Sequence, residues 1–465
     1  MNRKGMIALG AIVVSTVVTI WLHVGQILPR EQAVMCGIFI LAAVLWVSEA
    51  VPLYATAILV VGLQVVLLAN PGEWPGLGFI EAPTPGFRSF IASAADPVIV
   101  LFFGGFLLAQ AAGKVGVDAT LAGIILRWVG HRPRRVLAGL MVVTAVFSLW
   151  MSNTATAAMM LAMVTPMLAL IPKGDSFRKA LVLGVAFAAN IGGMGTPIAS
   201  PPNAVAMGFL RNAGYDVGFL QWMLVAVPLL TVLLVLCWVM LVTFYPPHQH
   251  DLRLEIPRRT LTGRGWFVIV IFSLTALLWL TEALHGLPAS VVALLPAVLF
   301  STTGLLKRED VNSLEWSILI LIAGGISLGT GMSLTGLDRT FVQWVLSGGS
   351  MNVWWLISAV VMITLALGTF MSNTAAANLL LPIGVSLAVT TDMGIHPTHI
   401  AMAIALVASV GMALPISTPP NAMAYAYGDL RTRDLAMIGG ALGLIAALLV
   451  IFGSKFVLQF WGVIP

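Results

Sequence analysis

The sequence MSNTATA at Met151–Ala157 returns as MSNTAAA at Met371–Ala377. Each copy interrupts a long apolar stretch, the first at 136–170 and the second at 353–390. The apolar arms on either side are about 11–17 residues long, which is short for a membrane crossing but suits one arm of a re-entrant hairpin. Non-helical backbone at membrane depth survives only where protein buries it or where it lines an aqueous cavity. Each triplet is therefore predicted to lie at the tip of a re-entrant hairpin.

A second pair of motifs follows the two hairpins. PIASPPNA at Pro197–Ala204 matches PISTPPNA at Pro415–Ala422, and both lie within otherwise apolar sequence. Two successive prolines remove two backbone donors and disfavour helix in the residue before them. The motifs therefore predict two broken helices, near 178–210 and near 398–427. Interrupted apolar segments at corresponding positions of two halves are typical of a transport site.

Two further blocks show that the duplication covers most of the chain. FGGFLLAQAAGKVGVDAT around Gly104 matches AGGISLGTGMSLTGLDRT around Gly324. Earlier in each half, WVSEA at Trp46–Ala50 returns as WLTEA at Trp279–Ala283. Four matched blocks in the same order indicate two homologous halves.

The polar stretch Tyr245–Gly263 marks the boundary between these halves. The first, 1–245, carries one extra N-terminal span before its repeat, and the second, 246–465, is the repeat alone. We count five full spans in the repeated unit. An odd number inverts the second copy, so an inverted repeat is predicted, as in many secondary transporters. A parallel duplication would require an even number.

The composition indicates a membrane protein. Of the 465 residues, 59% are hydrophobic and 9% are charged, whereas a soluble protein carries about 25% charged residues. The predicted fold class is an all-α polytopic membrane protein with about 11 transmembrane helices and two re-entrant hairpins, without a soluble domain. The clearest apolar runs are Met6–Leu28, Met35–Ala50, Tyr54–Leu68, Met223–Phe244, Trp266–Leu280 and Leu435–Phe452.

The distribution of basic residues predicts the orientation. The N-terminal apolar segment is longer than the core of a secretory signal, about 7–15 residues, so a retained first span is expected. With a cytoplasmic N-terminus, most basic side chains fall on the cytoplasmic side, as the positive-inside rule requires. The net charge of +5 therefore reflects orientation in the membrane and not a nucleic-acid binding patch. We expect a multi-pass protein of the bacterial inner (plasma) membrane, with no nucleic-acid partner. The basic residues on that side are Arg3, Lys4, Arg132, Arg134, Arg135, Lys173, Arg178, Lys179, Arg253, Arg258, Arg259, Arg264, Lys307, Arg308, Arg431 and Arg433.

The triplets also indicate the chemistry of the site. Ser, Asn and Thr at a helix start offer amide and hydroxyl groups, and the helix N-terminus itself favours an anion. No Arg or Lys falls near either triplet in the sequence. An anionic substrate must then be neutralised by co-bound cations, helix N-termini and amide donors. Freed carbonyls near Ala199 and Ser417 suit an alkali cation. The hypothesis from these residues is a secondary active transporter of a small anion that binds together with a cation such as Na⁺.

The paired triplets and Pro-Pro-Asn-Ala motifs resemble those of the divalent anion/sodium symporter (DASS) family, the INDY-type di- and tricarboxylate transporters. The resemblance extends over essentially the whole chain. It implies a homodimer in which a scaffold domain surrounds an elevator-like transport domain, with both domains interleaved between the halves. It implies substrate contacts and two sodium sites. The implied substrate contacts are Asn153, Thr154, Ser200, Asn373, Thr374 and Thr418; the first sodium site would use Ser148, Ser152, Asn153 and Ala199, and the second Thr369, Ser372, Asn373 and Ser417.

One position departs from the family pattern. Ser148 stands four residues before the first triplet, but Gly368 occupies the equivalent position before the second. Thr369 is the candidate replacement. The departure bears on mechanism, because some family members exchange anions without sodium.

Three charged residues near predicted span ends have less certain roles in the sequence pattern. Lys114 could meet an anion, but snorkelling of its ammonium group to the membrane interface is the simpler interpretation. Glu49 and Glu282 occupy equivalent positions in the two WxS/TEA motifs. Intramembrane acids are functional candidates, while their place at span ends favours a structural hydrogen bond.

Several alternative functions stay open at this point. The nearest is sodium-independent exchange of one dicarboxylate for another on the same fold. Transport of citrate, tartrate, sulfate or a sulfonate is also compatible with the motifs. A membrane-embedded enzyme would require a nucleophile–base pair or a metal-ligand cluster, and the sequence offers neither pattern. A channel is disfavoured by the paired broken helices, which indicate occlusion and alternating access.

Overall fold

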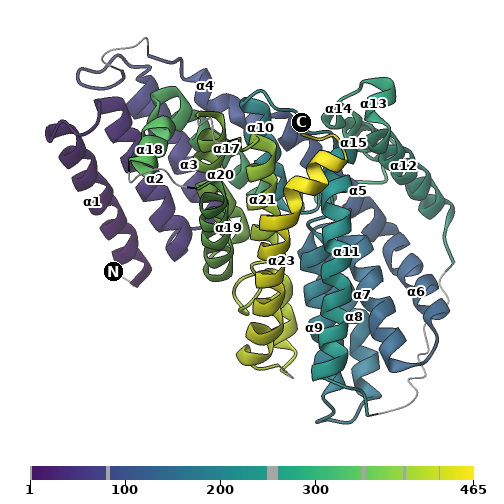
Figure 1. Ribbon diagram of the computed structural model, residues 1–465. Helices are drawn as coiled ribbons and strands as arrows, with labels where there is room; N and C mark the ends of the chain where they lie inside the picture. Colours follow the sequence, from purple (N-terminus) through teal and green to yellow (C-terminus); the bar gives the residue numbers. More distant parts are fainter. Residues whose placement is uncertain are drawn as a thin grey trace.

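The fold is entirely helical over the residues that the computed structural model describes, which are 3–79, 84–248, 260–347, 352–390, 394–428 and 430–464 (Figure 1). Nine helices in this part of the chain are long and apolar enough to cross a membrane. The predicted fold class, an all-α polytopic membrane protein, is confirmed. The basic residues Arg253, Arg258 and Arg259 lie outside the described residues.

Long helices make up most of the membrane-embedded part. The apolar runs identified in the sequence correspond to α1, α2, α3 with its π-helical extension, α11, α12 and α23, and the first two runs continue a few residues past the ends of α1 and α2. Figure 1 shows α11 and α23 as two long neighbouring helices near the middle of the molecule. The long helices outside the motif regions are α1 (Arg3–Val24), α2 (Arg30–Ser48), α3 (Leu53–Leu63) with its π-helical extension (Gln64–Ala69), α5 (Pro97–Val115), α6 (Val117–Val129), α11 (Phe219–Phe244), α12 (Gly263–Leu280), α17 (Trp316–Thr335), α18 (Leu337–Leu346) and α23 (Thr432–Phe460).

Short helices connect these elements. A one-turn helix and a 3-10 turn lead into α5, and the extended residue Asp96 separates them from it within the candidate span Arg88–Val115. The short elements are α4 (Arg88–Ile91), the 3-10 turn Ala92–Ala95, α13 (Glu282–His285), α14 (Ala289–Val292), α15 (Leu294–Thr302) and α16 (Arg308–Asn312).

A helix break lies at each Ser-Asn-Thr triplet. In the first half, α7 (Pro133–Ser148) packs against α8 (Asn153–Ala169), and in the second, α19 (Val353–Phe370) packs against α20 (Asn373–Thr390). The arms of the second pair are 18 residues each, longer than the arms expected from the apolar flanks alone. The difference arises because α20 begins within the triplet and its first turns are built from small and polar residues.

A second break lies at each Pro-Pro pair. The first half contains α9 (Phe177–Gly192) followed by α10 (Pro201–Asn212), and the second contains α21 (Pro397–Ser409) followed by α22 (Pro419–Ala426). Proline is favoured at the first position of a helix, where its fixed φ suits the helix and its missing N–H would have no partner in any case. Each motif therefore ends one irregular segment and starts a new helix.

The two broken helices run in opposite directions. Tyr215, just after α10, lies edge-on to His396, just before α21, with ring centroids 5.2 Å apart. At the other end, Lys179 Nζ in α9 lies 2.9 Å from Asp434 Oδ2 in α23, which follows α22. This antiparallel course is the one that an inverted repeat predicts. The relation between the complete halves stays a prediction.

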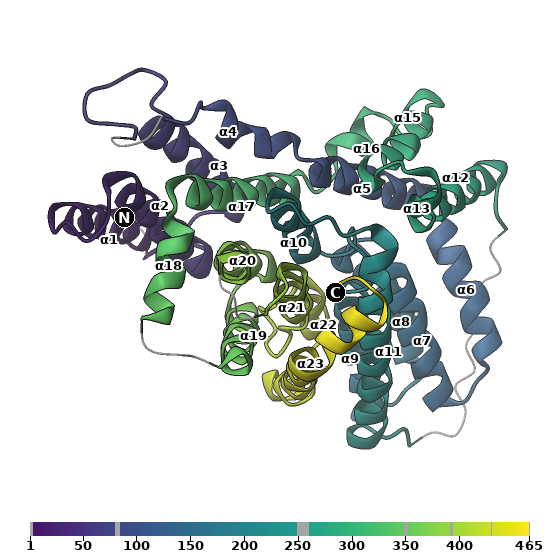
Figure 2. The same cartoon turned by 45° about the horizontal axis from the view of Figure 1, so that its top comes forward.

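Equivalent glycines allow close helix packing in both halves. A Cβ on Gly104 in α5 would lie 2.3 Å from the Ala293 carbonyl oxygen, and one on Gly324 in α17 would lie 2.3 Å from Ala57 Cβ. Only glycine permits backbones to approach this closely, as is common between membrane helices. Figure 2 shows α5 and α17 in a row along one side of the group that includes α10 and α20–α22.

Candidate functional site

The four motifs meet around one cavity of about 680 Å³. Its lining contains all three residues of each Ser-Asn-Thr triplet and parts of both Pro-Pro motifs. All six substrate contacts implied by the sequence resemblance line this cavity, together with most of the implied sodium ligands. Ser148 and Thr369 do not line it. The motif residues in the lining are Ser152, Asn153, Thr154, Ala199, Ser200, Pro201, Pro202, Ser372, Asn373, Thr374, Ser417, Thr418, Pro419, Pro420 and Ala422.

Helix N-termini converge on this cavity. The helices α8, α10, α20 and α22 all begin at residues of the lining. Ser152 caps α8 by accepting a hydrogen bond from the Ala155 N–H, and Thr418 caps α22 by accepting one from the Asn421 N–H, both at 3.3 Å. In the described part of the chain, no Lys, Arg or His lines the cavity. The positive groups of this lining are therefore the partial charges of the helix N-termini, which favour an anion beside them.

The tip of the first hairpin is tied to the first broken helix through Ser148. The fully buried Ser148 hydroxyl lies 2.8 Å from Asn153 Oδ1 and 2.6 Å from the Ala189 carbonyl oxygen. A Cβ on Gly193 would lie 2.2 Å from Asn153 Oδ1, so only glycine leaves room for this amide. Ser148, Asn153 and Ala189 thus form a cluster of oxygen atoms directly behind the cavity wall.

The tip of the second hairpin lacks this arrangement. Thr369 donates its hydroxyl proton to the Leu365 carbonyl of its own helix at 2.8 Å, and Ser417 donates to the Thr369 carbonyl at 2.7 Å. No side chain at Gly368 reaches the triplet. As a result, Asn373 Oδ1 is buried without a hydrogen-bond partner among the described residues. A buried acceptor in this state favours a cation or donor group that fills the site.

Three buried asparagines hold the broken helices, and sequence reasoning assigned them no role. Asn203 Nδ2 donates to the Gly193 and Thr196 carbonyls at 3.0 and 2.8 Å. Asn421 Nδ2 donates to the equivalent loop, at Met412 and Leu414, at 2.7 and 3.0 Å. The Pro-Pro-Asn-Ala pattern therefore contains its own brace: each asparagine satisfies the carbonyls that the helix break leaves free.

Asn190 joins the two halves. It is fully buried in α9, lines the cavity, and donates to Thr418 Oγ1 at 3.1 Å and to Asn421 Oδ1 at 3.0 Å. Its own Oδ1 has no partner among the described residues. The signal in the sequence was a lone amide within the apolar run FAANIGG.

The acidic residues Glu49, Glu282 and Glu315 differ in whether they line the cavity. Glu282 is structural, because its carboxylate accepts from the Ala289 N–H at 3.2 Å and the Phe219 N–H at 3.4 Å. Glu49, at the equivalent position of the first half, lines the cavity instead. Glu315, which sequence reasoning did not identify, also lines it and accepts a hydrogen bond from Ser152 Oγ at 3.3 Å.

Lys114 is paired with Asp310, outside the cavity. The ammonium group bonds to the carboxylate of Asp310 in α16. This contact and the Lys307 backbone N–H hold the pKa of Asp310 below its usual value. The ion pair gives Lys114 an acidic partner and places its positive charge outside the cavity, while snorkelling to the membrane interface stays a prediction.

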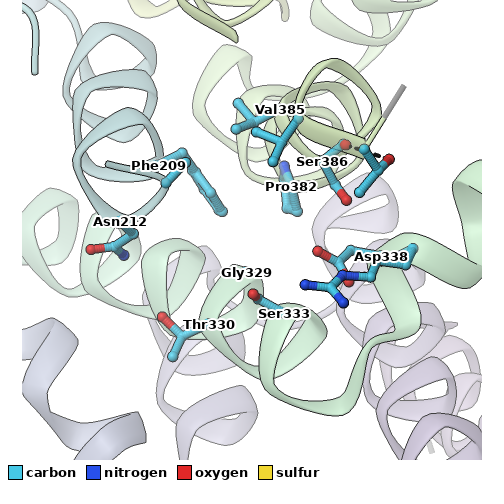
Figure 3. Close-up of a pocket in the computed structure, with 13 residues that line it drawn as sticks. Phe209, Asn212, Gly329, Thr330, Ser333, Asp338, Pro382, Val385 and Ser386 are labelled. Atoms are coloured by element: carbon cyan, nitrogen blue, oxygen red, sulfur yellow. Dashed lines mark hydrogen bonds between the residues drawn. The ribbon is translucent and has the colours of Figure 1, made fainter. Parts of the chain in front are cut away.

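A second cavity, of about 150 Å³, lies between α10, α17 and α20 (Figure 3). Phe209, Ser333 and Ser386 contribute to its lining. None of the site residues implied by the motifs lines it. Ser386 Oγ is buried there without a partner among the described residues, on the same helix as Asn373 but remote from the triplet.

Comparison with known proteins places the chain in a family. The sequence model of the citrate transporter (CitMHS) family matches residues 43–393 and, in a second overlapping match, 276–465. The chain belongs to the citrate transporter family. An uncharacterised transporter of Haemophilus influenzae is 32% identical over 448 residues, covering 91% of this chain and 92% of that protein.

Relatives of this citrate transporter family member include sodium-dependent proteins. The sodium-dependent dicarboxylate transporter SdcS of Staphylococcus aureus is 28% identical, covering 93% of this chain and 87% of its own. The inorganic phosphate transporter PHO87 of Saccharomyces cerevisiae is 32% identical over 85% of this chain. The chain spans less than half the length of the yeast relatives it matches, 43% in the case of PHO87. The predicted resemblance to divalent anion/sodium symporters is confirmed.

Solved structures share the fold. The YdaH transporter of Alcanivorax borkumensis superposes with a TM-score of 0.56 over 90% of this chain and 98% of its own, at 14% identity. MtrF of Neisseria gonorrhoeae gives the same TM-score over 87% of this chain and 94% of its own, at 13% identity. This citrate transporter family member is thus a multi-pass helical membrane protein with the fold of known transporters.

Proposed function

We propose that the chain is a secondary active transporter that moves a small divalent anion together with Na⁺ across the bacterial inner membrane, with its N-terminus in the cytoplasm. A C4-dicarboxylate such as succinate or malate is the proposed substrate, and a tricarboxylate is a possible larger one. The observation that carries the proposal is the cavity itself: two repeated triplets and four helix N-termini around one space, without a basic side chain in the described lining.

The charges explain why a cation should accompany the anion. Helix N-termini supply only partial positive charge, and the lining carries the carboxylates of Glu49 and Glu315. A dianion entering this space requires further positive charge. Sodium at the oxygen atoms around Ser148, Asn153 and Ala199, and around Asn373 and Ser417, would provide it. Substrate and sodium would then raise each other's affinity, because binding linkage is reciprocal.

Movement of the site follows from the same proposal. We propose that the hairpins and broken helices form a transport domain that moves as an elevator against a scaffold, within a homodimer. The close glycine contacts of α5 with Ala293 and of α17 with Ala57 would belong to the scaffold side. The antiparallel broken helices support two near-equivalent packings, one open to each side of the membrane.

Uptake into proteoliposomes tests the proposal directly. Labelled succinate should accumulate when Na⁺ is higher outside, and dissipation of the sodium gradient should abolish accumulation above equilibrium. Indifference to sodium would contradict symport. Counterflow that needs internal dicarboxylate but no sodium would instead establish an exchanger on the same fold.

Phosphate is a second candidate substrate, because the PHO87 relative carries the name of an inorganic phosphate transporter. Phosphate is also a small oxyanion with up to two charges near neutral pH, so the same cavity chemistry applies. Competition of unlabelled succinate, malate, citrate, phosphate and sulfate against labelled succinate distinguishes the substrates. Sulfate and sulfonates are the weaker candidates.

Gly368→Ser should strengthen the response to sodium. A Cβ at Gly368 would lie 3.4 Å from Asn373 Oδ1 and 3.3 Å from the Ala408 carbonyl oxygen, a tight fit in which these neighbours must shift by a few tenths of an ångström. The new hydroxyl would reproduce the Ser148–Asn153 pair in the second half. We expect the half-saturating sodium concentration for succinate uptake to fall by up to about tenfold. Gly368→Ala, which adds Cβ without a hydroxyl, is the control, and identical behaviour of both variants would contradict the prediction.

A further inference from the structure

Glu315 connects the second half of the chain to the tip of the first hairpin. It directly precedes α17 and lines the cavity, and its Oε1 accepts a hydrogen bond from Ser152 Oγ at 3.3 Å. Its carboxylate does not cap its own helix, since α17 has no side-chain cap hydrogen bond. The equivalent helix of the first half, α5, also follows an acid, but Asp96 caps that helix by accepting a hydrogen bond from the Val98 N–H. Glu315 is therefore not used as a helix cap in the way that Asp96 is, and its carboxylate is directed to Ser152.

The contact with Glu315 determines the direction of the Ser152 hydroxyl proton and of its lone pairs. A serine hydroxyl has one proton and two lone pairs. The proton goes to the Glu315 carboxylate, and one lone pair accepts from the Ala155 N–H at 3.3 Å. The second lone pair remains for another partner. A hydroxyl fixed in this way offers its oxygen, and not its proton, to a cation.

Glu315 also changes the electrostatics of the cavity. A carboxylate beside an anion site repels the substrate unless a cation lies between them, and the repulsion is stronger at low local dielectric. Glu49 adds a second acid, and no basic side chain stands in the described lining to offset either charge. An empty cavity of this kind attracts a cation and disfavours an anion.

We propose that Glu315 is a positioning residue and counter-charge for the sodium site at Ser152, and that it makes the anion bind only after the cation. This inference rests on the proposed sodium-coupled function. Glu315 orients the Ser152 oxygen toward the cation and stabilises the bound cation by its charge. Once the cation has bound, the same charge no longer excludes a dianion from the helix N-termini.

Glu315→Gln tests the inference, because it keeps the shape and the hydrogen-bond acceptor for Ser152 but removes the charge. We expect the half-saturating sodium concentration to rise about tenfold or more. We also expect substrate binding in sodium-free buffer, measured by thermal shift with succinate, to become detectable. Glu315→Asp should restore most of the sodium response. Glu309→Gln, at an exposed acid of α16, is the matched control and should behave as wild type.

The outcomes separate this inference from the proposed function. A wild-type protein that takes up succinate without any response to sodium overturns the coupling, and the inference with it. A wild-type protein that responds to sodium, beside a Glu315→Gln variant with the same sodium dependence, overturns the inference alone. A variant with a lowered melting temperature and an unchanged half-saturating sodium concentration shows a purely structural contact and also overturns it.

Discussion

Asn373→Ala is expected to lower sodium-driven uptake of succinate by about 10- to 100-fold without lowering the melting temperature. Asn373 Oδ1 is buried at the cavity without a hydrogen-bond partner among the described residues. Its removal therefore breaks no hydrogen bond of this oxygen among the described residues. A hydrogen bond or ion contact to a charged ligand contributes about 1.5–3 kcal/mol, so kcat/KM should fall by about 10- to 100-fold. Uptake assays and thermal unfolding in detergent measure the two effects separately.

Ser386→Ala is the matched control for this variant. Ser386 lies on the same helix, α20, and its Oγ is likewise buried without a partner, but in the smaller cavity (Figure 3). It should retain both uptake and melting temperature. If Asn373→Ala took up succinate like the wild type, the result would contradict the assignment of the second triplet to the substrate and sodium site. If Asn373→Ala lost uptake and also melted at a clearly lower temperature than the wild type, the result would indicate a structural role instead.

Asn421→Ala is expected to lower the melting temperature and to abolish uptake together. Its fully buried amide donates to Met412 and Leu414 and accepts from Asn190. Truncation leaves two buried carbonyls without their donor and weakens the connection between the halves. Loss of such a buried network costs about 2–4 kcal/mol. Thermal unfolding in detergent, with and without succinate and sodium, measures the effect.

Asn212→Ala serves as its control, since Asn212 ends α10 and is exposed. It should unfold at the wild-type temperature. An Asn421→Ala variant that melts with the wild type would contradict the assignment of this amide as the brace of the broken helix.

The breaks in the helices could be predicted because their causes are local. Proline pairs lack donors wherever they occur, and the Ser-Asn-Thr triplets contain good helix caps, so residues 152–153 and 200–201 mark helix starts in the sequence and in the structure alike. The arms of the second hairpin were harder to predict. The small and polar residues that begin α20 lowered its hydropathy, although they lie in helix.

The contacts between the halves could not be predicted from the sequence. Asn190 meets Thr418 and Asn421, and Glu315 meets Ser152, across separations of more than 150 residues. A lone polar residue in an apolar run signals importance but not its partner. The two equivalent acids illustrate the same limit: Glu282 bonds to backbone N–H groups while Glu49 lines the cavity. Only the packing of the helices distinguishes them.

The most direct test of the account is a cryo-EM reconstruction of the protein with saturating succinate in high sodium. We predict substrate density inside the cavity of about 680 Å³, between the N-termini of α8 and α20, within hydrogen-bond reach of both Ser-Asn-Thr triplets. Succinate density bound elsewhere, with this cavity empty under conditions that support uptake, would contradict the claim that the two triplets form one anion site.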